Sequence, residues 1–440
     1  MITVALLALL AVSTNVAIAG DAGQFVVELG ALLNARIDPI VDPGNTADKG
    51  HAHTIFGANN FRNQLNTHAQ ITGAECTSAM IQADKSNYWI PTLYWINGAG
   101  EYEAAWLKGA RAYYMFQDNT KTEPFPEGFR MISGTATTRT RSDKTVGISY
   151  NTPFANLAEY LPNNTNSGTT NLPAWQFTFK IQFPACGTGA LDSPDHFSHM
   201  AWPLNSNNKP DPQFGIKCPI THPKRYPTIQ LEVYWTLWSQ QAAKWRKGPN
   251  DINLILGTGD TLGGSLHADF VNGWDTNVMK AALADKQCFQ NVDVEGTKCP
   301  AFKPTVNIPK ARACRYRGQV PDEELGYYKP LKNLPGCNPR WDANVATKPS
   351  ACPAGYKKPG WTWPNVAWAS WENFPIWPLA VNFPNAVGKP TAAFLQQFTP
   401  TLGDKFVPWG SVATTPSGSA EDIKNNLDIV TAPNKVQQVA

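Results

Sequence analysis

Six of the seven histidines fall in short polar motifs, and imidazole is the side chain best suited to both metal binding and proton transfer near neutral pH. His51 and His53 form an H-x-H pair. On a strand, residues two apart point to one face, so both rings would be placed for chelation. Asp195, His196 and His199 form a second motif, in which one helical turn would bring both rings to one side beside a carboxylate.

Two further motifs add titratable groups. His222 follows the sequence CPIT at 218–221, and His267 and Asp269 stand two residues apart, which is strand spacing. Histidine packs poorly and is costly to bury, so six clustered histidines with aspartate neighbours predict a shared functional cleft. The competing interpretation is that His–Asp pairs hold ordered loops together through hydrogen bonds.

Strands are the elements that would position these motifs. Apolar residues alternate with polar ones, or form aromatic runs between turn residues, in four segments: Trp175–Phe183, Ile229–Leu237, Tyr88–Ile96 and Ala110–Phe116. Helical patterns are scarce, and one short helix is predicted over Asn277–Lys286, capped by Asp275 or Thr276. The sequence therefore predicts a mainly β protein, with a two-sheet sandwich or jelly-roll-like domain and long loops.

The compartment follows from the N-terminus and the cysteines. An apolar run over Ile2–Val12 and the small residues of Ala17–Ala19 predict a signal peptide over residues 1–19. That run is shorter than the about 20 residues of a membrane span, and no span is expected. Eight cysteines in a chain sent to an oxidising compartment predict disulfides, whose pairing is left open. Asn163 begins an N-glycosylation motif, so we expect an extracellular glycoprotein.

Composition divides the rest of the chain. A β-rich domain is expected over residues 24–290, a Cys-, Pro- and Trp-rich, disulfide-bonded extension over 291–411, and a flexible polar tail over 412–440. The net charge of +3 is too small to create the positive electrostatic field that nucleic-acid binding needs, so no nucleic-acid partner is expected. The 16 tryptophans fit either sugar-stacking surfaces or a sheet core.

Six blocks of sequence carry a family resemblance, in this order: HAHTIFGANNF (51–61), DKSNYWIPTLY (84–94), FPEGFRMISG (125–134), LDSPDHFSHMAWP (191–203), CPITHPKRYPTIQLEVY (218–234) and HADFVNGWD (267–275). They resemble a secreted fungal family catalogued as domain of unknown function nineteen-ninety-six, a domain often joined to carbohydrate-binding WSC modules. The resemblance covers roughly residues 36–288 and implies a setting at cell walls and on plant biomass, without an activity. Ala268 stands where the family often has glycine, and no WSC pattern follows Cys288.

An enzyme acting on a polysaccharide or cell-wall glycan is the leading hypothesis. The catalytic candidates are Asp195, His196, His199, Asp269, His267 and Arg130. In a glycoside hydrolase, Asp195 and Asp269 would flank the scissile bond. In a polysaccharide lyase, His196 or His199 would abstract a proton while Arg130 neutralised a uronate. The candidates for substrate binding are Trp202, Tyr88, Trp274 and His222.

Two alternatives belong to other classes of protein. The first is a metal-binding protein with zinc or copper, whose predicted ligands are His51, His53, His196 and His199, with His222 and His267 as further donors. The predicted mature N-terminus is Gly20 and not histidine, so an amino-terminal copper brace is not expected. The second is a noncatalytic carbohydrate-binding or structural wall protein, in which the histidines only stabilise loops.

Overall fold

The structure is a computed structural model that describes residues 20–44, 50–65, 67–140, 144, 147–150, 176–236, 253–289, 296–314, 316, 318–326 and 329–362. The predicted signal peptide, the glycosylation motif at Asn163 and the predicted tail lie outside the described residues.

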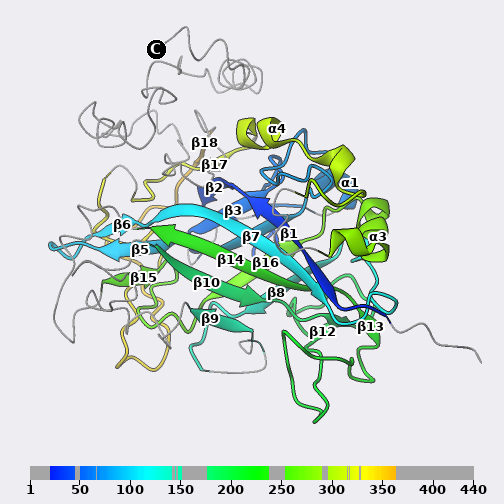
Figure 1. The fold of residues 1–440 in the computed structure, drawn as a ribbon. Helices are drawn as coiled ribbons and strands as arrows, with labels where there is room; N and C mark the ends of the chain where they lie inside the picture. The colour runs from blue at the N-terminus through cyan, green and yellow to red at the C-terminus, as the bar shows by residue number, and fades with distance from the viewer. Residues whose placement is uncertain are drawn as a thin grey trace, which may run out of the picture.

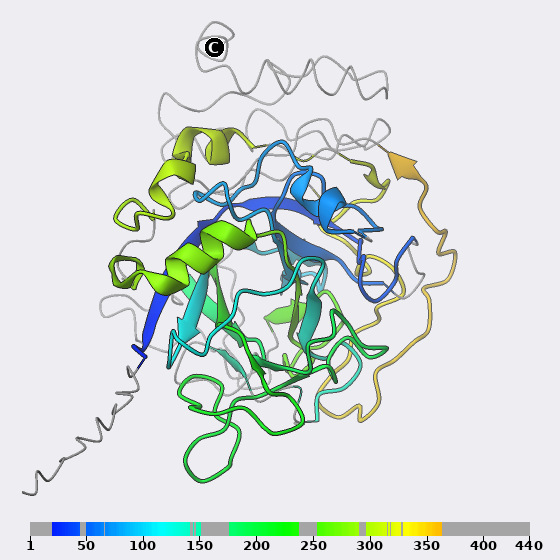
Figure 2. The same ribbon diagram turned by 90° about the vertical axis from the view of Figure 1, so that its right-hand side faces the viewer.

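Two five-stranded antiparallel sheets form the body of the molecule (Figures 1 and 2). The first has the order β1 (Gly23–Leu29), β7 (Trp106–Phe116), β14 (Thr228–Thr236), β10 (Gln176–Gln182) and β9 (Ile148–Tyr150). The second has the order β2 (Ala31–Ala35), β3 (His53–Gly57), β4 (Asn87–Pro91), β16 (His267–Val271) and β8 (Arg130–Gly134). The predicted sandwich class is confirmed.

Smaller elements surround the two sheets. Three short sheets comprise β15 (Leu254–Leu256), β5 (Leu93–Ile96) and β6 (Tyr102–Ala104); β12 (Met200–Ala201), β11 (Cys186–Gly187) and β13 (Lys224–Arg225); and β17 (Val320–Pro321) with β18 (Trp361–Thr362). The helices are α1 (His68–Thr72), α3 (Thr276–Ala284) and α4 (Ile308–Ala313), with 3-10 turns η3 (Lys286–Cys288) and η4 (Lys303–Thr305). None of these described helices has the length and apolarity that a bilayer crossing requires.

The main core lies between the two large sheets, because alternate residues of each strand point inward. The second sheet contributes Phe56, Tyr88 and Phe270 to this core, opposite residues such as Leu231 of the first sheet. Its other face carries Ile55, Trp89, Ile132 and Val271, which pack in a second apolar cluster with Leu65 and Tyr316. The second sheet is therefore covered on both faces.

The predicted elements are confirmed with one adjustment. Period-two alternation correctly predicts β10 and β14, whereas the run Tyr88–Ile96 is two strands, β4 and β5, which belong to different sheets. The break falls at Thr92, whose backbone N–H donates to the carbonyl of Ala52. The predicted helix is α3, and Asp275 is its N-cap, accepting hydrogen bonds from two backbone N–H groups.

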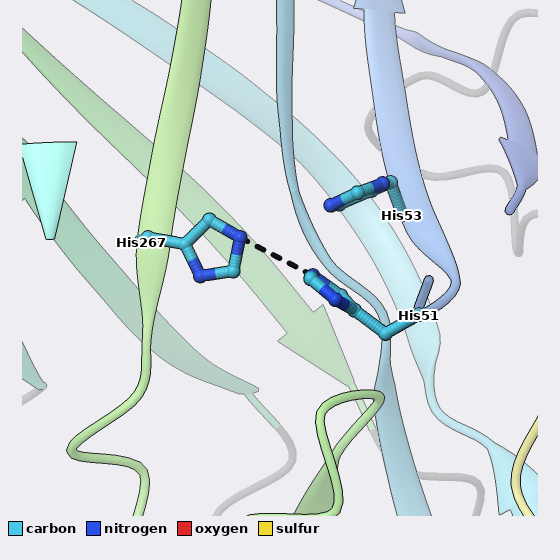
Figure 3. Close-up of side chains that lie close together, drawn as sticks. All are labelled: His51, His53 and His267. Carbon is cyan, nitrogen blue, oxygen red and sulfur yellow. Dashed lines mark hydrogen bonds between the residues drawn. The ribbon is translucent and has the colours of Figure 1, made fainter. Parts of the chain in front are cut away.

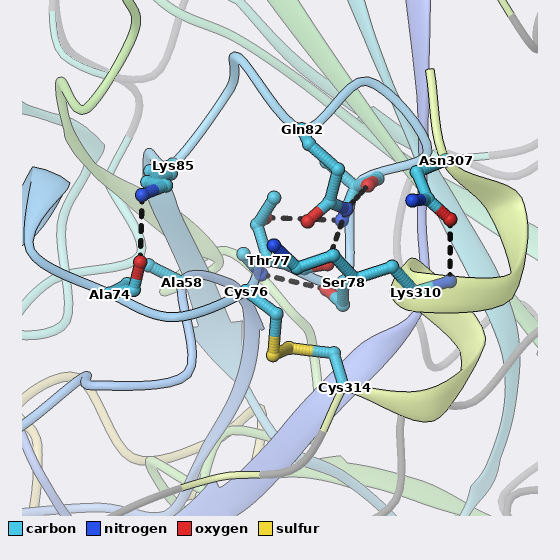
Figure 4. Close-up of a disulfide and its surroundings, with 12 residues drawn as sticks. Ala58, Ala74, Cys76, Thr77, Ser78, Gln82, Lys85, Asn307, Lys310 and Cys314 are labelled. Atoms are coloured by element: carbon cyan, nitrogen blue, oxygen red, sulfur yellow. Dashed lines mark hydrogen bonds between the residues drawn. A yellow bond between two sulfur atoms is a disulfide. The ribbon is translucent and has the colours of Figure 1, made fainter. Parts of the chain in front are cut away.

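Four disulfides join the eight cysteines: Cys76–Cys314, Cys186–Cys218, Cys288–Cys299 and Cys337–Cys352. The first ties the loop before β4 to the end of α4 (Figure 4). The region after residue 296 also contacts the sandwich through polar groups. Asn338 donates to the carbonyl of Gly50, and the Arg36 guanidinium lies 2.9 Å from Glu323. The described part of the extension therefore lies against the β-rich domain.

Candidate metal centre

Three histidines meet where the strands β3 and β16 of the second sheet begin (Figure 3). His53 is the first residue of β3 and His267 is the first residue of β16. Both strands are hydrogen-bonded to β4, which lies between them. His51 stands two residues before His53, so the H-x-H spacing keeps its ring on the same side. The register of the sheet thus brings together residues that are 216 positions apart in the sequence.

The three rings are close enough to share one ion. The Nε2 atoms of His51 and His267 are 3.2 Å apart, and one ring nitrogen from each histidine lies within 4.8 Å of the others. All three side chains are buried. Among the described residues, this is the group of histidine, cysteine and acidic side chains whose geometry fits a metal ion.

Hydrogen bonds fix the outer nitrogens of two rings. His53 Nδ1 lies 3.0 Å from the carbonyl of Ile37, and His267 Nδ1 lies 2.9 Å from the carbonyl of Ser265. A carbonyl only accepts, so both Nδ1 atoms carry the proton and both Nε2 atoms present a lone pair. His53 Nε2 has no hydrogen-bond partner among the described residues. Histidines that bind metals are typically oriented by this kind of hydrogen bond on the opposite nitrogen.

The electrostatics keep the rings neutral. Burial, together with the nearby His267, lowers the pKa of His53 to about 3. Burial lowers the pKa of His267 to about 4, and burial also holds the pKa of His51 well below its ordinary value. The charges of Lys348 and Arg36 act on His51 in the same direction. Neutral imidazole is the form that binds a metal.

Two carboxyl groups lie near the three histidines. Asp269 is fully buried, and its Oδ2 is 3.9 Å from His267 Nε2. Burial and the neighbouring Asp38 raise the pKa of Asp269 well above its ordinary value. Burial also raises the pKa of Asp38 to about 6, although the backbone N–H groups of Val41 and Ile40 oppose that shift.

A cleft of about 660 Å³ opens over the three rings. Its lining includes His51, His53, His267, Asp38, Asp195 and Lys348. Lys348 comes from the region after the β-rich domain, so that region forms part of the wall. No sequence motif marks Asp38 or Lys348 as residues of the cleft. His267 and Asp269 do carry a signal, because they alternate with the apolar residues of a strand.

The motif around Asp195 forms a turn, and not the helical turn that would bring both rings to one side. The Asp195 carboxylate accepts the backbone N–H groups of Phe197 and Ser198, and His196 adopts a positive φ of 55°. The ring of His196 contacts Asp192. The ring of His196 is thus held by Asp192 and not by the ring of His199.

The remaining groups of this motif are held on the loop. His199 is buried, with Nε2 2.9 Å from the carbonyl of Arg130. Burial alone would raise the pKa of Asp195, but the N–H groups of Ser198 and Phe197 and the Lys144 ammonium hold it well below its ordinary range. Neither His196 nor His199 belongs to the group of three. Of the four predicted metal ligands, the structure brings together His51 and His53 and adds His267.

Arg130 and His222 lie in polar surroundings outside the group of three. Arg130 Nη2 donates to the carbonyl of Leu65, and its Nε is 3.8 Å from Asp192. His222 is on the surface, with Nε2 3.1 Å from the carbonyl of Ser198. Neither residue is among those that line the cleft.

The aromatic candidates for substrate binding are in the interior. The Tyr88 hydroxyl donates to Asp84 at 2.7 Å, and Trp274 Nε1 donates to the Tyr114 hydroxyl at 2.8 Å. Tyr88, Trp274 and Trp202 expose 0, 1 and 4% of their surface. In this structure they pack the core and offer no stacking platform.

Comparison with known proteins gives one match. A family model with the description "Domain of unknown function (DUF1996)" matches residues 38–274. The matched range contains all three histidines together with Asp38 and Asp269. No curated protein and no solved structure matches the chain.

Proposed function

Because this chain belongs to the DUF1996 family, whose name assigns no activity, we propose that it is an extracellular metalloprotein in which His51, His53 and His267 hold one zinc or copper ion beside a cleft. The observation that carries the proposal is the convergence of three buried ring nitrogens, with two rings oriented by backbone carbonyls. Four disulfides support the extracellular setting.

Imidazole donors favour zinc or copper over the oxygen-seeking ions calcium and magnesium. Catalytic zinc sites have three protein ligands and keep one position for water or substrate, whereas structural zinc sites are closed. Three histidines with an adjoining cleft resemble the catalytic kind. A metal in such a set supplies Lewis-acid chemistry and lowers the pKa of bound water. The chain contributes the fixed ring orientations and, in Asp195 and Lys348, charged groups along the cleft.

An enzyme acting on a polysaccharide or cell-wall glycan remains our proposal for the ligand and reaction class, supported by the charged side chains that line the cleft and by the family setting. A metal-free hydrolase with Asp195 and Asp269 as its carboxylate pair has weaker support. Asp195 lines the cleft, whereas Asp269 is fully buried and is not among the lining residues. A carboxylate pair in a glycosidase must reach both sides of one sugar bond.

Elemental analysis of the purified full chain tests the metal site. We expect one zinc or copper per wild-type chain, and loss of that metal in His53→Ala and in His267→Ala. His222→Ala is the matched control, because His222 is only half-buried and lies outside the group of three, and it should keep the metal. His196→Ala should also keep it, since its ring contacts Asp192.

Thermal melting supplies the second readout. A ligand at a hundred times its Kd stabilises the folded state by about 2.7 kcal/mol, so chelation should lower the Tm of the wild type and leave the His53→Ala variant unchanged. A wild-type chain that stays metal-free after incubation with zinc and with copper would refute the proposal.

A further inference from the structure

We propose that Asp269 is a fourth ligand of the metal held by His51, His53 and His267, so that the site is a His₃Asp centre for a divalent ion. This inference rests on the proposed function and adds a residue that the three-histidine grouping does not include.

The strand places Asp269 and His267 on one face of the second sheet. Ala268 and Phe270 of β16 point into the core between the two large sheets. Successive side chains of a strand alternate, so His267 and Asp269 both point to the opposite face. Across the sheet, Asp269 lies directly opposite Trp89 on β4. The carboxylate of Asp269 thus lies on the same face of the strand as the ring of His267, two residues further along β16.

The carboxylate of Asp269 is buried without compensation from the protein. It exposes 0% of its surface, and neither of its oxygens has a hydrogen-bond partner among the residues that the structure describes. Burying a carboxylate without a partner is costly, and buried charges in proteins are normally paired or coordinate metals. An unsatisfied buried acid beside three neutral imidazoles is explained if all four groups serve one cation.

The ring nitrogen of His267 that Asp269 approaches shows whether Asp269 could be a metal ligand or only a group that orients the ring. A carboxylate that only orients a metal-bound histidine contacts the nitrogen turned away from the metal. In His267 that nitrogen is Nδ1, and the carbonyl of Ser265 already occupies it. Asp269 Oδ2 instead lies 3.9 Å from Nε2, the nitrogen that faces His51.

The two distances measured from His267 Nε2 suit a common ion, whereas the Asp269 oxygens lie outside the 4.8 Å grouping of the three ring nitrogens. Ligand atoms at about 2.0–2.2 Å from zinc are themselves about 3–4 Å apart over the usual range of bond angles. The Nε2–Nε2 distance of 3.2 Å and the Oδ2–Nε2 distance of 3.9 Å both fall in that range.

The three histidines and Asp269 lie on different sides of the proposed metal position. His51, His53 and His267 line the cleft, whereas Asp269 does not. The carboxylate therefore approaches from the buried side, and the cleft side stays available to water or a ligand. An anionic oxygen donor favours a divalent ion such as zinc over cuprous copper, which prefers soft sulfur ligands.

Asp269→Asn is the decisive variant, because it keeps the size of the side chain and removes its charge. We expect the zinc Kd, measured by competition with a chromophoric chelator, to rise at least a hundredfold. Loss of a group that only orients a ligand typically costs 10–100-fold. The Tm of the metal-free variant should equal or exceed that of the metal-free wild type, since an uncompensated buried carboxylate has been removed.

Asp192→Asn is the matched control, because this aspartate contacts His196 and Arg130, is not among the residues that line the cleft, and should leave the zinc Kd within a factor of three. If the wild type binds zinc and Asp269→Asn binds it equally well, the inference is overturned while the three-histidine site stands. If the wild type itself binds no metal, the proposed function fails first.

A second variant covers the case in which Asp269→Asn does not fold. Asp269→Glu keeps the carboxylate and moves it relative to the ion, so the visible absorption of the cobalt(II)-substituted protein should shift from that of the wild type. An identical cobalt spectrum would contradict direct ligation.

Discussion

At the scale of single residues, the main feature of the site is that its histidines are neutral when the protein is folded. Burial depresses the pKa of His53 to about 3 and that of His267 to about 4. In the unfolded chain both rings would titrate near the ordinary value of about 6.5. Between these values the unfolded chain binds protons that the folded chain does not, so acid favours unfolding.

This difference predicts how the stability of the metal-free protein depends on pH. The contribution of His53 is fully present above pH 6.5 and is lost as the pH falls toward 3. Lowering the pH from 7.5 to 4.5 should therefore raise the unfolding equilibrium constant of the wild type about a hundredfold more than that of His53→Gln. Urea denaturation at both pH values measures this difference.

The raised pKa of Asp269 acts in the opposite direction, because the folded form then binds the extra proton. Its contribution is common to both proteins and cancels in the comparison. Equal pH dependence of the two proteins would show that His53 titrates normally in the folded state.

At the scale of elements, a row of charges ties four strands of the first sheet together. Glu28 of β1 lies opposite Arg111 of β7, which lies opposite Glu232 of β14, which lies opposite Lys180 of β10. Arg111 Nε is 2.8 Å from Glu28, and Lys180 Nζ is 3.1 Å from Glu232. Val27 and Leu29 point into the core, so this row lies on the outer face of the sheet.

Replacing the central arginine should destabilise the sheet more than replacing the lysine at its end. Arg111→Met removes the ion pair that Arg111 makes with the nearly buried Glu28, and we expect a loss of about 3 kcal/mol in the free energy of unfolding. Lys180 is 42% exposed, so Lys180→Met should cost at most about 1 kcal/mol. Chemical denaturation of both variants measures the two losses in the free energy of unfolding. Equal losses would contradict the expectation that the more buried ion pair contributes more.

The elements also show how much of this structure the sequence predicts. Local periodicity suffices for β10, β14 and α3, because each has a regular apolar pattern. It also places His51 and His53 on one side. The third ring depends on β4 lying between β3 and β16, and that long-range register leaves no local trace.

The turn over residues 195–199 has a local cause. A spacing of three is compatible with a helix, but His196 adopts a positive φ of 55°, which lies outside the right-handed helical region and turns the backbone away directly after Asp195. The buried positions of Tyr88 and Trp274 follow from their strand and core environment, which composition alone cannot distinguish from a sugar-binding surface.

At the scale of the whole molecule, the longest-range covalent link is the disulfide between Cys76 and Cys314, with a sequence separation of 238 residues. A crosslink restricts the unfolded chain more strongly when it closes a longer loop. The disulfide between Cys288 and Cys299 spans only 11 residues and serves as the internal comparison.

Removing each disulfide by paired Cys→Ser substitution should therefore have unequal effects. From loop-closure entropy we expect a loss of about 5 kcal/mol for Cys76–Cys314 and about 3 kcal/mol for Cys288–Cys299. Denaturant titrations of the two double variants under oxidising conditions measure both values. A larger loss for the short loop would mean that local packing, and not chain entropy, governs their contributions.

The same long link makes a closed ring of most of the sandwich. The segment that carries His51 and His53 enters this ring at Cys76, and His267 lies within it. A protease that cuts one peptide bond inside the ring opens the ring without separating the chain into two molecules. The segments that carry His51, His53 and His267 would remain covalently tethered in such a nicked protein.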